Sequence, residues 1–154
     1  MKNFIKTIFA VLFGNIIFFG FFILVFVLMM IGLAVNSDNK NIKIKVALPK
    51  DTINVRADQV HLRRVFFNLV YNAIKFTPAG GTVSLSLTQY KQDVIVRVSD
   101  TGVGIEQSQL DKIFDRFYRI GNETTRTTKG TGLGLYLCER IAHHHQATIT
   151  VKDN

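Results

Sequence analysis

An uncharged apolar run near the N-terminus constrains this chain more than any other feature. Between Thr7 and Val35 there is no charged residue, and Thr7 and Asn15 are the only clearly polar side chains. As a single helix this run would be about 43 Å long at 1.5 Å per residue, which exceeds the roughly 30 Å of hydrocarbon in a bilayer. We therefore expect a tilted transmembrane helix over residues 7–35, with residues 1–6 as an N-terminal cytoplasmic or flanking segment.

A cleavable signal peptide is the alternative interpretation of this run. The apolar core of a signal peptide is usually about 7–15 residues long and ends in small residues where cleavage occurs. Because the run is longer, we favour a retained anchor. Two lysines precede the run and four lie between residues 40 and 50. This distribution slightly favours a cytoplasmic C-terminal side under the positive-inside rule.

The rest of the chain is long enough for one domain of ordinary size. Residues 36–41 form a polar linker, and the domain occupies residues 42–154. Of the 19 Lys and Arg residues two precede the run, whereas all 11 Asp and Glu residues follow it, so this part has a net charge of +6. The basic residues are scattered and no nucleic-acid-binding signature accompanies them. We expect no nucleic-acid partner, because a nucleotide polyphosphate or an anionic membrane surface explains the surplus as well.

Polar–apolar alternation and helical periodicity predict an α+β fold in which helices cover one face of a sheet. Asp58 is the predicted N-cap of a helix that ends near Phe76. The core face of this helix is expected to contain Leu62, Val65, Phe66, Leu69 and Ala73. Further helices are expected over residues 108–119 and 134–144, with Cys138 as a buried filler in the second. Strands are expected over residues 42–46, 53–55, 82–88, 93–99 and 147–151.

A polar stripe follows the first predicted helix. Asn68, Asn72 and Lys75 are spaced i, i+4 and i+7, which places them within about 60° of one another, apart from the apolar face. Amide oxygens can join the octahedron of Mg²⁺, and a lysine can meet phosphate as a point charge. On its own, such a stripe is more often a solvated helix face.

Two glycine-containing turns lie further along the chain. The segment Asp100-Thr101-Gly102-Val103-Gly104 follows a predicted strand; its carboxylate can accept a hydrogen bond from an exocyclic amine, and its glycines allow close approach of a flat base. The segment from Lys129 to Gly134 enters the last predicted helix, whose free amide groups and dipole favour phosphate. It matches neither a Walker A loop nor a dinucleotide fingerprint. Taken singly, each segment could be a structural turn.

The order and spacing of these segments resemble the ATP-binding family of histidine kinases, within the wider group that includes gyrase, Hsp90 and MutL. The sequence N-L-V-Y-N-A-I-K at residues 68–75 looks like the N box, and D-T-G-V-G at 100–104 looks like the G1 box. F-D-R-F at 114–117 and G-T-G-L-G at 130–134 look like the F and G2 boxes. The resemblance covers about residues 42–151 and implies a two-layer α/β sandwich of the Bergerat type.

The resemblance also implies ATP and Mg²⁺ as cofactors. Asn72 would help to hold Mg²⁺, and Phe76 would lie against the adenine. Asp100 would accept a hydrogen bond from the adenine amine, with Gly102 and Gly104 beside the base.

The phosphates would be held on the other side of the same site. Lys75 would contact phosphate, Arg116 or Arg119 could also reach it, and residues 119–129 would form the ATP lid. The phosphate loop would consist of Lys129, Gly130, Thr131, Gly132, Leu133 and Gly134.

Asn68 bears on the reaction. In the gyrase, Hsp90 and MutL branch, the residue four positions before the metal-binding Asn is a Glu that activates water. An amide cannot act as a general base near neutral pH, so Asn68 favours transfer of the γ-phosphate over hydrolysis. The resemblance then implies an ATP-dependent histidine kinase module, with Asn68, Asn72 and Lys75 as catalytic residues. Its acceptor would be a histidine on a dimerisation domain supplied in trans, with a response regulator downstream.

The chain departs from this family in several places. There is no room for the helical hairpin that carries the acceptor histidine, and His61 lacks the neighbours of an acceptor motif. Gln146 replaces the usual Gly after His145, and the family's final strand is missing. The last predicted helix closes with His143, His144 and His145. Because consecutive side chains point from different faces of a helix, a metal site with all three as ligands is disfavoured.

The N-terminal segment is a further departure. Residues 1–32, which begin M-K-N-F, weakly resemble membrane anchors of bacterial signal-peptide peptidases. A fusion, a truncated reading frame and an engineered chain are all compatible with that. We expect a single-pass protein of the bacterial inner membrane with a cytoplasmic ATP-binding domain. A non-catalytic nucleotide-binding remnant and a gyrase-like ATPase remain as alternatives.

Overall fold

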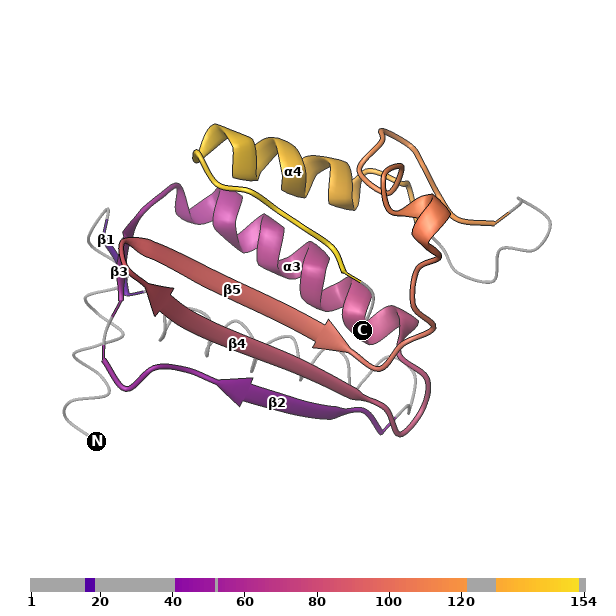
Figure 1. Ribbon diagram of the computed structural model, residues 1–154, viewed down its shortest axis with the longest axis horizontal. Helices are drawn as coiled ribbons and strands as arrows, with labels where there is room; N and C mark the ends of the chain where they lie inside the picture. Colours follow the sequence, from indigo (N-terminus) through magenta and orange to yellow (C-terminus); the bar gives the residue numbers. More distant parts are fainter. Residues whose placement is uncertain (1–15, 19–40, 52, 122–129, 153–154) are drawn as a thin grey trace.

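The computed structural model describes residues 16–18, 41–51, 53–121 and 130–152. Its larger sheet has the strand order β2 (Lys43–Ala47), β4 (Thr82–Tyr90) and β5 (Asp93–Asp100). β2 runs parallel to β4, and β4 and β5 form an antiparallel hairpin. Helix α3 (Gln59–Phe76) covers one face of this sheet, and helix α4 (Gly134–His144) packs against α3 (Figure 1). The predicted two-layer α/β sandwich is thereby confirmed.

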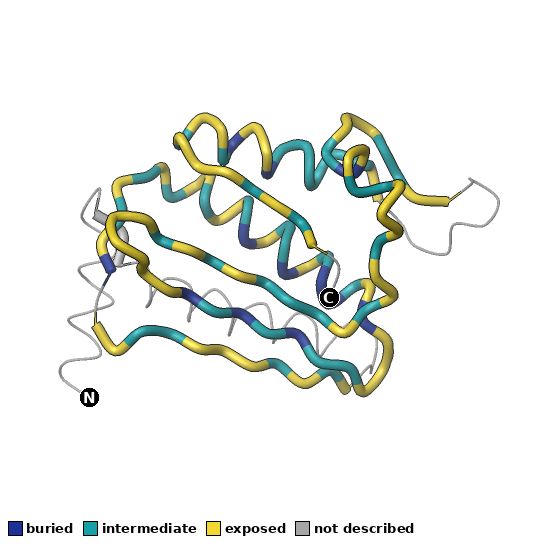
Figure 2. Tube along the Cα trace, viewed as in Figure 1, coloured by how far each residue is buried: buried dark blue, intermediate teal, exposed yellow. Residues whose placement is uncertain are grey.

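The hydrophobic core lies between α3 and the sheet. Alternate residues of β4 turn toward the helix and are almost completely buried (Figure 2). The facing residues of this core are Val83, Leu85 and Leu87 on β4 and Phe66, Val70, Ala73 and Ile74 on α3. Burial of one such aliphatic or aromatic side chain contributes about 1.5–3 kcal/mol, so this interface holds the two layers together.

Helix α3 begins and ends where the sequence predicts. The Asp58 carboxylate accepts hydrogen bonds from the backbone N–H groups of Val60 and His61, at 2.8 and 3.0 Å, which confirms it as the N-cap. At the other end the Thr77 hydroxyl donates to the Ala73 carbonyl at 2.6 Å, and Pro78 follows. These two local signals determine the length of the helix that carries the polar stripe.

The core face of α3 is rotated from the predicted one. Phe66 and Ala73 are buried as predicted, and half-buried Leu62 packs against the core. Val65 and Leu69 are also only half-buried, whereas Val70 and Ile74, which were not predicted, are buried. The reason is that α3 has two neighbours, since it contacts the sheet on one side and α4 on the other. Cys138 of α4 is fully buried with its Sγ 3.8 Å from the Val65 carbonyl oxygen, and burial raises the pKa of its thiol to about 11. The prediction of Cys138 as a buried filler is confirmed.

The prediction of a helix over residues 108–119 was wrong. A short 3₁₀ helix, η1 (Gln107–Gln109), is followed by turns, and Phe117 has a positive φ of 66° that an α-helix does not allow. The Phe117 N–H donates to the Gly132 carbonyl at 3.0 Å, so a contact with a distant loop replaces the helical hydrogen bond. The expected apolar side is also divided, because Ile113 is buried while Phe117 is 59% exposed.

Two predicted strands differ from the structure. Residues 147–151 pair with no described strand, because Gln146 turns the chain with φ 55° and the Ala147 N–H donates back to Ala142. The strand expected over residues 53–55 is present as β3 (Asn54–Arg56), but it pairs with β1 (Ile16–Phe18) and not with the main sheet. The hairpin strands and β2 form within two residues of their predicted bounds.

The transmembrane helix predicted over residues 7–35 lies outside the described residues, except for Ile16–Phe18. Those three residues are in strand β1 and differ from the helical prediction at that point. Within the described part of the chain, no helix combines the length and hydropathy needed to cross a membrane.

Candidate functional site

The polar stripe of α3 lies under the loop that leads into α4. Asn68, Asn72 and Lys75 are all half-buried, so this face of the helix is not simply solvated. A Cβ at Gly134 would lie 3.2 Å from Asn68 Oδ1, and one at Gly130 would lie 3.4 Å from Lys75 Nζ. The glycine loop therefore follows the stripe at van der Waals distance, and the two motifs form one surface.

The Asp100 turn lies at the C-terminal end of the same helix. The Asp100 carboxylate ends β5 and accepts a hydrogen bond from the Gly102 N–H at 2.8 Å. A Cβ at Gly102 would lie 2.9 Å from the Phe76 carbonyl oxygen, so only glycine fits between this turn and α3. Thr101 anchors the turn to β4, because it exchanges two hydrogen bonds with Thr82.

The Phe114–Phe117 segment is attached to the glycine loop by its backbone. Gly132 has φ 71°, and a Cβ there would lie 2.6 Å from the Phe117 carbonyl carbon. The Tyr118 hydroxyl donates to the Gln109 side chain, which ties this segment to η1. The guanidinium of Arg116 lies 4.7 Å from the centre of the Phe117 ring. These contacts bring the fourth motif to the same loop.

Positive charge gathers beside the stripe. Burial lowers the pKa of Lys75, and the nearby charge of Arg119 lowers it further. The Lys75 ammonium also lies 4.8 Å from the centre of the Phe76 ring. Two like charges disfavour each other in this way, and an anion bound between them would relieve the repulsion. Such an arrangement suits a polyphosphate.

The start of α4 adds to this anion-binding character. Leu133, its N-cap, makes no side-chain capping hydrogen bond, and the first turn contains no acidic residue. The first amide groups of a helix lack intrahelical partners and carry the positive end of its dipole. Gly130 and Thr131 are exposed just before this point. Phosphates placed along this loop would meet the helix end at Gly134 and the Lys75 ammonium at Gly130.

The other predicted residues have distinct surroundings. Phe76 is 42% exposed beside the Asp100 turn, and Gly104 has a positive φ of 71°. Arg116 is exposed, whereas Arg119 is half-buried. Lys129 and most of the predicted lid, residues 122–129, lie outside the described residues.

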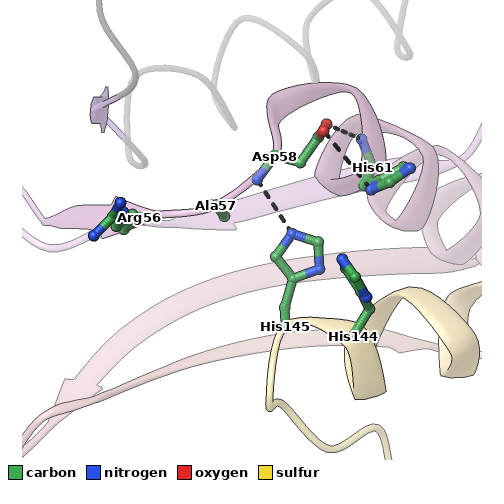
Figure 3. A pocket seen from close by; sticks show the side chains of 6 residues that line it. All are labelled: Arg56, Ala57, Asp58, His61, His144 and His145. Atoms are coloured by element: carbon green, nitrogen blue, oxygen red, sulfur yellow. Dashed lines mark hydrogen bonds and ion pairs between the residues drawn. The ribbon is translucent and has the colours of Figure 1, made fainter.

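A separate cavity of about 400 Å³ lies at the opposite end of α3 and was not predicted (Figure 3). It is lined by Arg56, Ala57, Asp58, His61, His144 and His145. His145 Nε2 accepts from the Asp58 N–H at 3.1 Å, while its Nδ1 lies 2.8 Å from the Ile141 carbonyl oxygen and must donate to it. The cavity has no glycine loop and contains a carboxylate, so its chemistry does not favour a polyphosphate. Within the described ranges, no three His, Cys, Asp or Glu side chains are placed to hold a metal ion.

Comparison with known proteins agrees with this geometry. Residues 57–154 match the family described as "Histidine kinase-, DNA gyrase B-, and HSP90-like ATPase". The chain is 40% identical over 110 residues to sensor protein KdpD of Clostridium acetobutylicum, covering 71% of this chain and 12% of that protein. It is 43% identical over 95 residues to sensor histidine kinase RppB of Synechocystis sp., covering 62% of this chain and 21% of that protein. The chain thus spans less than a quarter of the length of these two relatives.

Solved structures show the same fold. The catalytic domain of histidine kinase ThkA superposes with a TM-score of 0.71 at 26% identity, covering 84% of this chain and 80% of that chain. Full-length ShkA in complex with AMPPNP superposes with a TM-score of 0.59 at 29% identity, covering 75% of this chain and 23% of that chain.

Proposed function

The chain belongs to the family of histidine kinase-, DNA gyrase B- and HSP90-like ATPases and contains a histidine kinase ATP-binding catalytic domain, and from this we propose that it transfers the γ-phosphate of ATP to a histidine of another domain. The acceptor histidine belongs to a dimerisation domain supplied in trans. A response regulator receives the phosphate from that histidine.

The arrangement of the four motifs supports this proposal most directly, because the stripe of α3 and the Phe114–Phe117 segment contact the glycine loop while the Asp100 turn packs against the end of α3. Residues separated by more than 60 positions in the chain, such as Asn68 and Gly134, are in contact, and the cations Lys75 and Arg119 lie beside them. In the proposed complex the adenine lies at Phe76, Gly102 and Gly104, with its amine donating to Asp100. The phosphates lie over the loop from Gly130 to Gly134, toward Lys75.

The donor set also fits Mg²⁺. Asn72 projects a neutral amide from the half-buried stripe, and a neutral oxygen can share an octahedral site with phosphate oxygens and water. When bound, the ion would neutralise phosphate charge. The protein's own residues would hold the nucleotide in place, because Asn68 supports the start of α4 and Lys75 orients the phosphates.

Transfer is favoured over hydrolysis by Asn68. Its amide cannot remove a proton from water near neutral pH, and its Oδ1 is in contact with the backbone at Gly134. The domain therefore holds ATP without a general base at this position, and the γ-phosphate remains available to an external acceptor.

We also propose that residues 7–35 anchor the protein in the bacterial inner membrane, with the ATP-binding domain on the cytoplasmic side. The length and hydropathy of the uncharged run support the anchor, as does its weak similarity to the anchors of signal-peptide peptidases. Insertion of the run as a helix requires Ile16–Phe18 to leave their pairing with β3. Protease protection on sealed membranes tests this orientation. Digestion of the C-terminal domain only from the outer surface of cells would contradict it.

The central experiment mixes the purified full chain with γ-labelled ATP, Mg²⁺ and a histidine-containing dimerisation domain. Label on the acceptor, lost when its histidine is replaced by alanine, is the expected result. Nucleotide binding without transfer to any of a panel of acceptors would favour the alternative of a regulatory nucleotide-binding remnant. Steady phosphate release that disappears in Asn68→Ala would favour a gyrase-like ATPase.

A further inference from the structure

The face of the main sheet that points away from the helices is basic and partly apolar. In the register of the three strands, Val46, Leu85 and Val98 share the core side. Their neighbours in each strand point the opposite way. We define the outer sheet face by its exposed basic and apolar residues, which are Lys43, Lys45, Tyr90, Ile95 and Arg97.

This face combines positive charge with apolar surface. Lys43, Lys45 and Arg97 are exposed, while Tyr90 is 62% and Ile95 43% exposed. Between them lie small uncharged side chains of β4, among them Thr88, and within the described strands Asp93 is the acid on this side. Lysine and arginine beside aromatic and aliphatic groups are the composition that anionic headgroups attract.

The tether limits how far this face can lie from a membrane. Seven residues, 36–42, separate the end of the uncharged run from Lys43, the first residue of β2. A fully extended chain of that length spans at most about 25 Å. When the run enters the bilayer and Ile16–Phe18 separate from β3, this tether keeps the outer sheet face within reach of the headgroups. Attraction between the charges extends only over about 8–10 Å, so it holds the face in place where the two surfaces approach closely.

The alternative surface for docking is the helical layer, which also carries exposed basic residues such as Arg63, Arg64 and Arg140. That layer contains Glu139 as well, and it is the side on which the glycine loop and the polar stripe meet (Figure 1). Docking by the helices would press the ATP site against the bilayer. Docking by the sheet leaves this site open to an acceptor domain.

We propose that the outer sheet face docks onto the anionic headgroups of the membrane that holds the N-terminal run, which orients the ATP site away from the bilayer. This inference rests on the proposed membrane anchor, but it does not depend on phosphoryl transfer. The partner is a lipid surface, and the attraction is electrostatic with a smaller apolar contribution from Tyr90 and Ile95.

The test uses the full chain in nanodiscs of phosphatidylcholine, with and without phosphatidylglycerol. An environment-sensitive fluorophore is attached at Thr88→Cys on the outer sheet face, or at Glu139→Cys on α4 as the reference. Cys138 is fully buried and stays unlabelled. Lipids with a headgroup quencher should quench the Thr88 label in anionic nanodiscs only, with loss of quenching at high salt. The Glu139 label should not be quenched.

Charge-reversal variants complete the test. Combined Lys43→Glu, Lys45→Glu and Arg97→Glu should abolish the quenching, and each single change should reduce it. The matched control, Arg63→Glu with Arg64→Glu and Arg140→Glu, makes the same charge change on the helical layer and should leave it intact.

Three results of the quenching measurements overturn the docking alone. These are equal quenching of the two labels, equal quenching in both lipids, and loss of quenching in the helical control as well. A chain that does not enter the bilayer overturns docking and anchor together, whereas ATP binding and trans phosphorylation of the same samples report separately on the catalytic proposal.

Discussion

His145, just after α4, accepts a hydrogen bond from the backbone N–H of Asp58, the residue that caps α3, at 3.1 Å. The same imidazole donates through Nδ1 to the Ile141 carbonyl, so its tautomer is determined by two partners in different parts of the chain. This contact joins the end of one helix to the beginning of the other and holds the helical layer together at the edge remote from the glycine loop.

Replacement of His145 should therefore loosen the helix pair. We expect His145→Ala to lower the free energy of unfolding by about 0.5–1.5 kcal/mol, the usual net worth of one hydrogen bond. Urea unfolding followed by circular dichroism measures this. His144→Ala is the control, because among the described residues of this cluster that exposed neighbour makes ring contacts with His61 and His145. Equal destabilisation by both changes would contradict the role of this bond.

Acid should weaken the cap of α3 through Asp58. Hydrogen bonds from the helix backbone, chiefly that of His61, lower the pKa of this carboxyl below 3.8. A lowered pKa means that its contribution to stability is present above the unfolded pKa and is lost as pH falls through the folded one. Asp58→Asn keeps a capping oxygen but cannot ionise. The stability difference between wild type and Asp58→Asn should shrink below about pH 4, and a difference that stays constant to pH 2 would reject this explanation.

Gly132 should be indispensable for the packing of the phosphate loop. Gly132→Ala would place a methyl group 2.6 Å from the Phe117 backbone in addition to its positive φ. Gly80→Ala is a matched control, since Gly80 has φ 77° but no atom within 4 Å of the added carbon. We expect both changes to cost about 1 kcal/mol of backbone strain, but only Gly132→Ala to weaken ATP binding, by at least about tenfold. Calorimetric titration with ATP measures the affinity of both variants. Similar affinities of Gly132→Ala and Gly80→Ala for ATP would contradict the role of Gly132 in the phosphate loop.

Lys75 should lower the stability of the nucleotide-free domain and strengthen nucleotide binding. Burial and the nearby charge of Arg119 disfavour the charged form of Lys75 and lower its pKa. Lys75→Met removes this unfavourable charge, so the nucleotide-free protein should unfold at a higher temperature. The same change should weaken ATP binding about tenfold or more, because a charged contact to phosphate is lost. A variant that is both less stable and unchanged in affinity would remove Lys75 from the site.

Asp100 should distinguish adenine from other bases. Asp100→Asn presents an amide group where a carboxylate is expected to accept from the adenine amine, which should weaken ATP binding by about 1–3 kcal/mol. GTP, which has a carbonyl at the corresponding position, should bind the variant no worse than it binds the wild type. Titration with both nucleotides checks this, and an unchanged affinity for ATP would reject the adenine assignment.

Local signals predicted most of the fold, and contacts distant in sequence account for the errors. The caps of α3, the β4–β5 hairpin and the start of α4 all depend on residues a few positions apart. The predicted helix over residues 108–119 failed because Phe117 bonds to Gly132. The core face of α3 was rotated because α4 covers one of its sides, and apolar periodicity alone does not reveal a second neighbour.

The candidate site shows the same division. The residue types, their spacing and the order of the four segments are properties of the sequence, and they were sufficient to identify the ATP-binding family. The cavity at His145 and Asp58 was missed because its residues are 87 positions apart and belong to no common motif.

The sequence by itself determined the chemistry available to this protein, because hydrogen-bond donors, charges and glycines are given by residue type and are ordered by short-range spacing. Only the tertiary structure decided which of them meet. Gly134 touches Asn68, Gly132 touches Phe117, and His145 reaches Asp58. Such contacts depend on how α3, α4 and the sheet pack to bury their apolar faces, and that packing is a property of the whole domain.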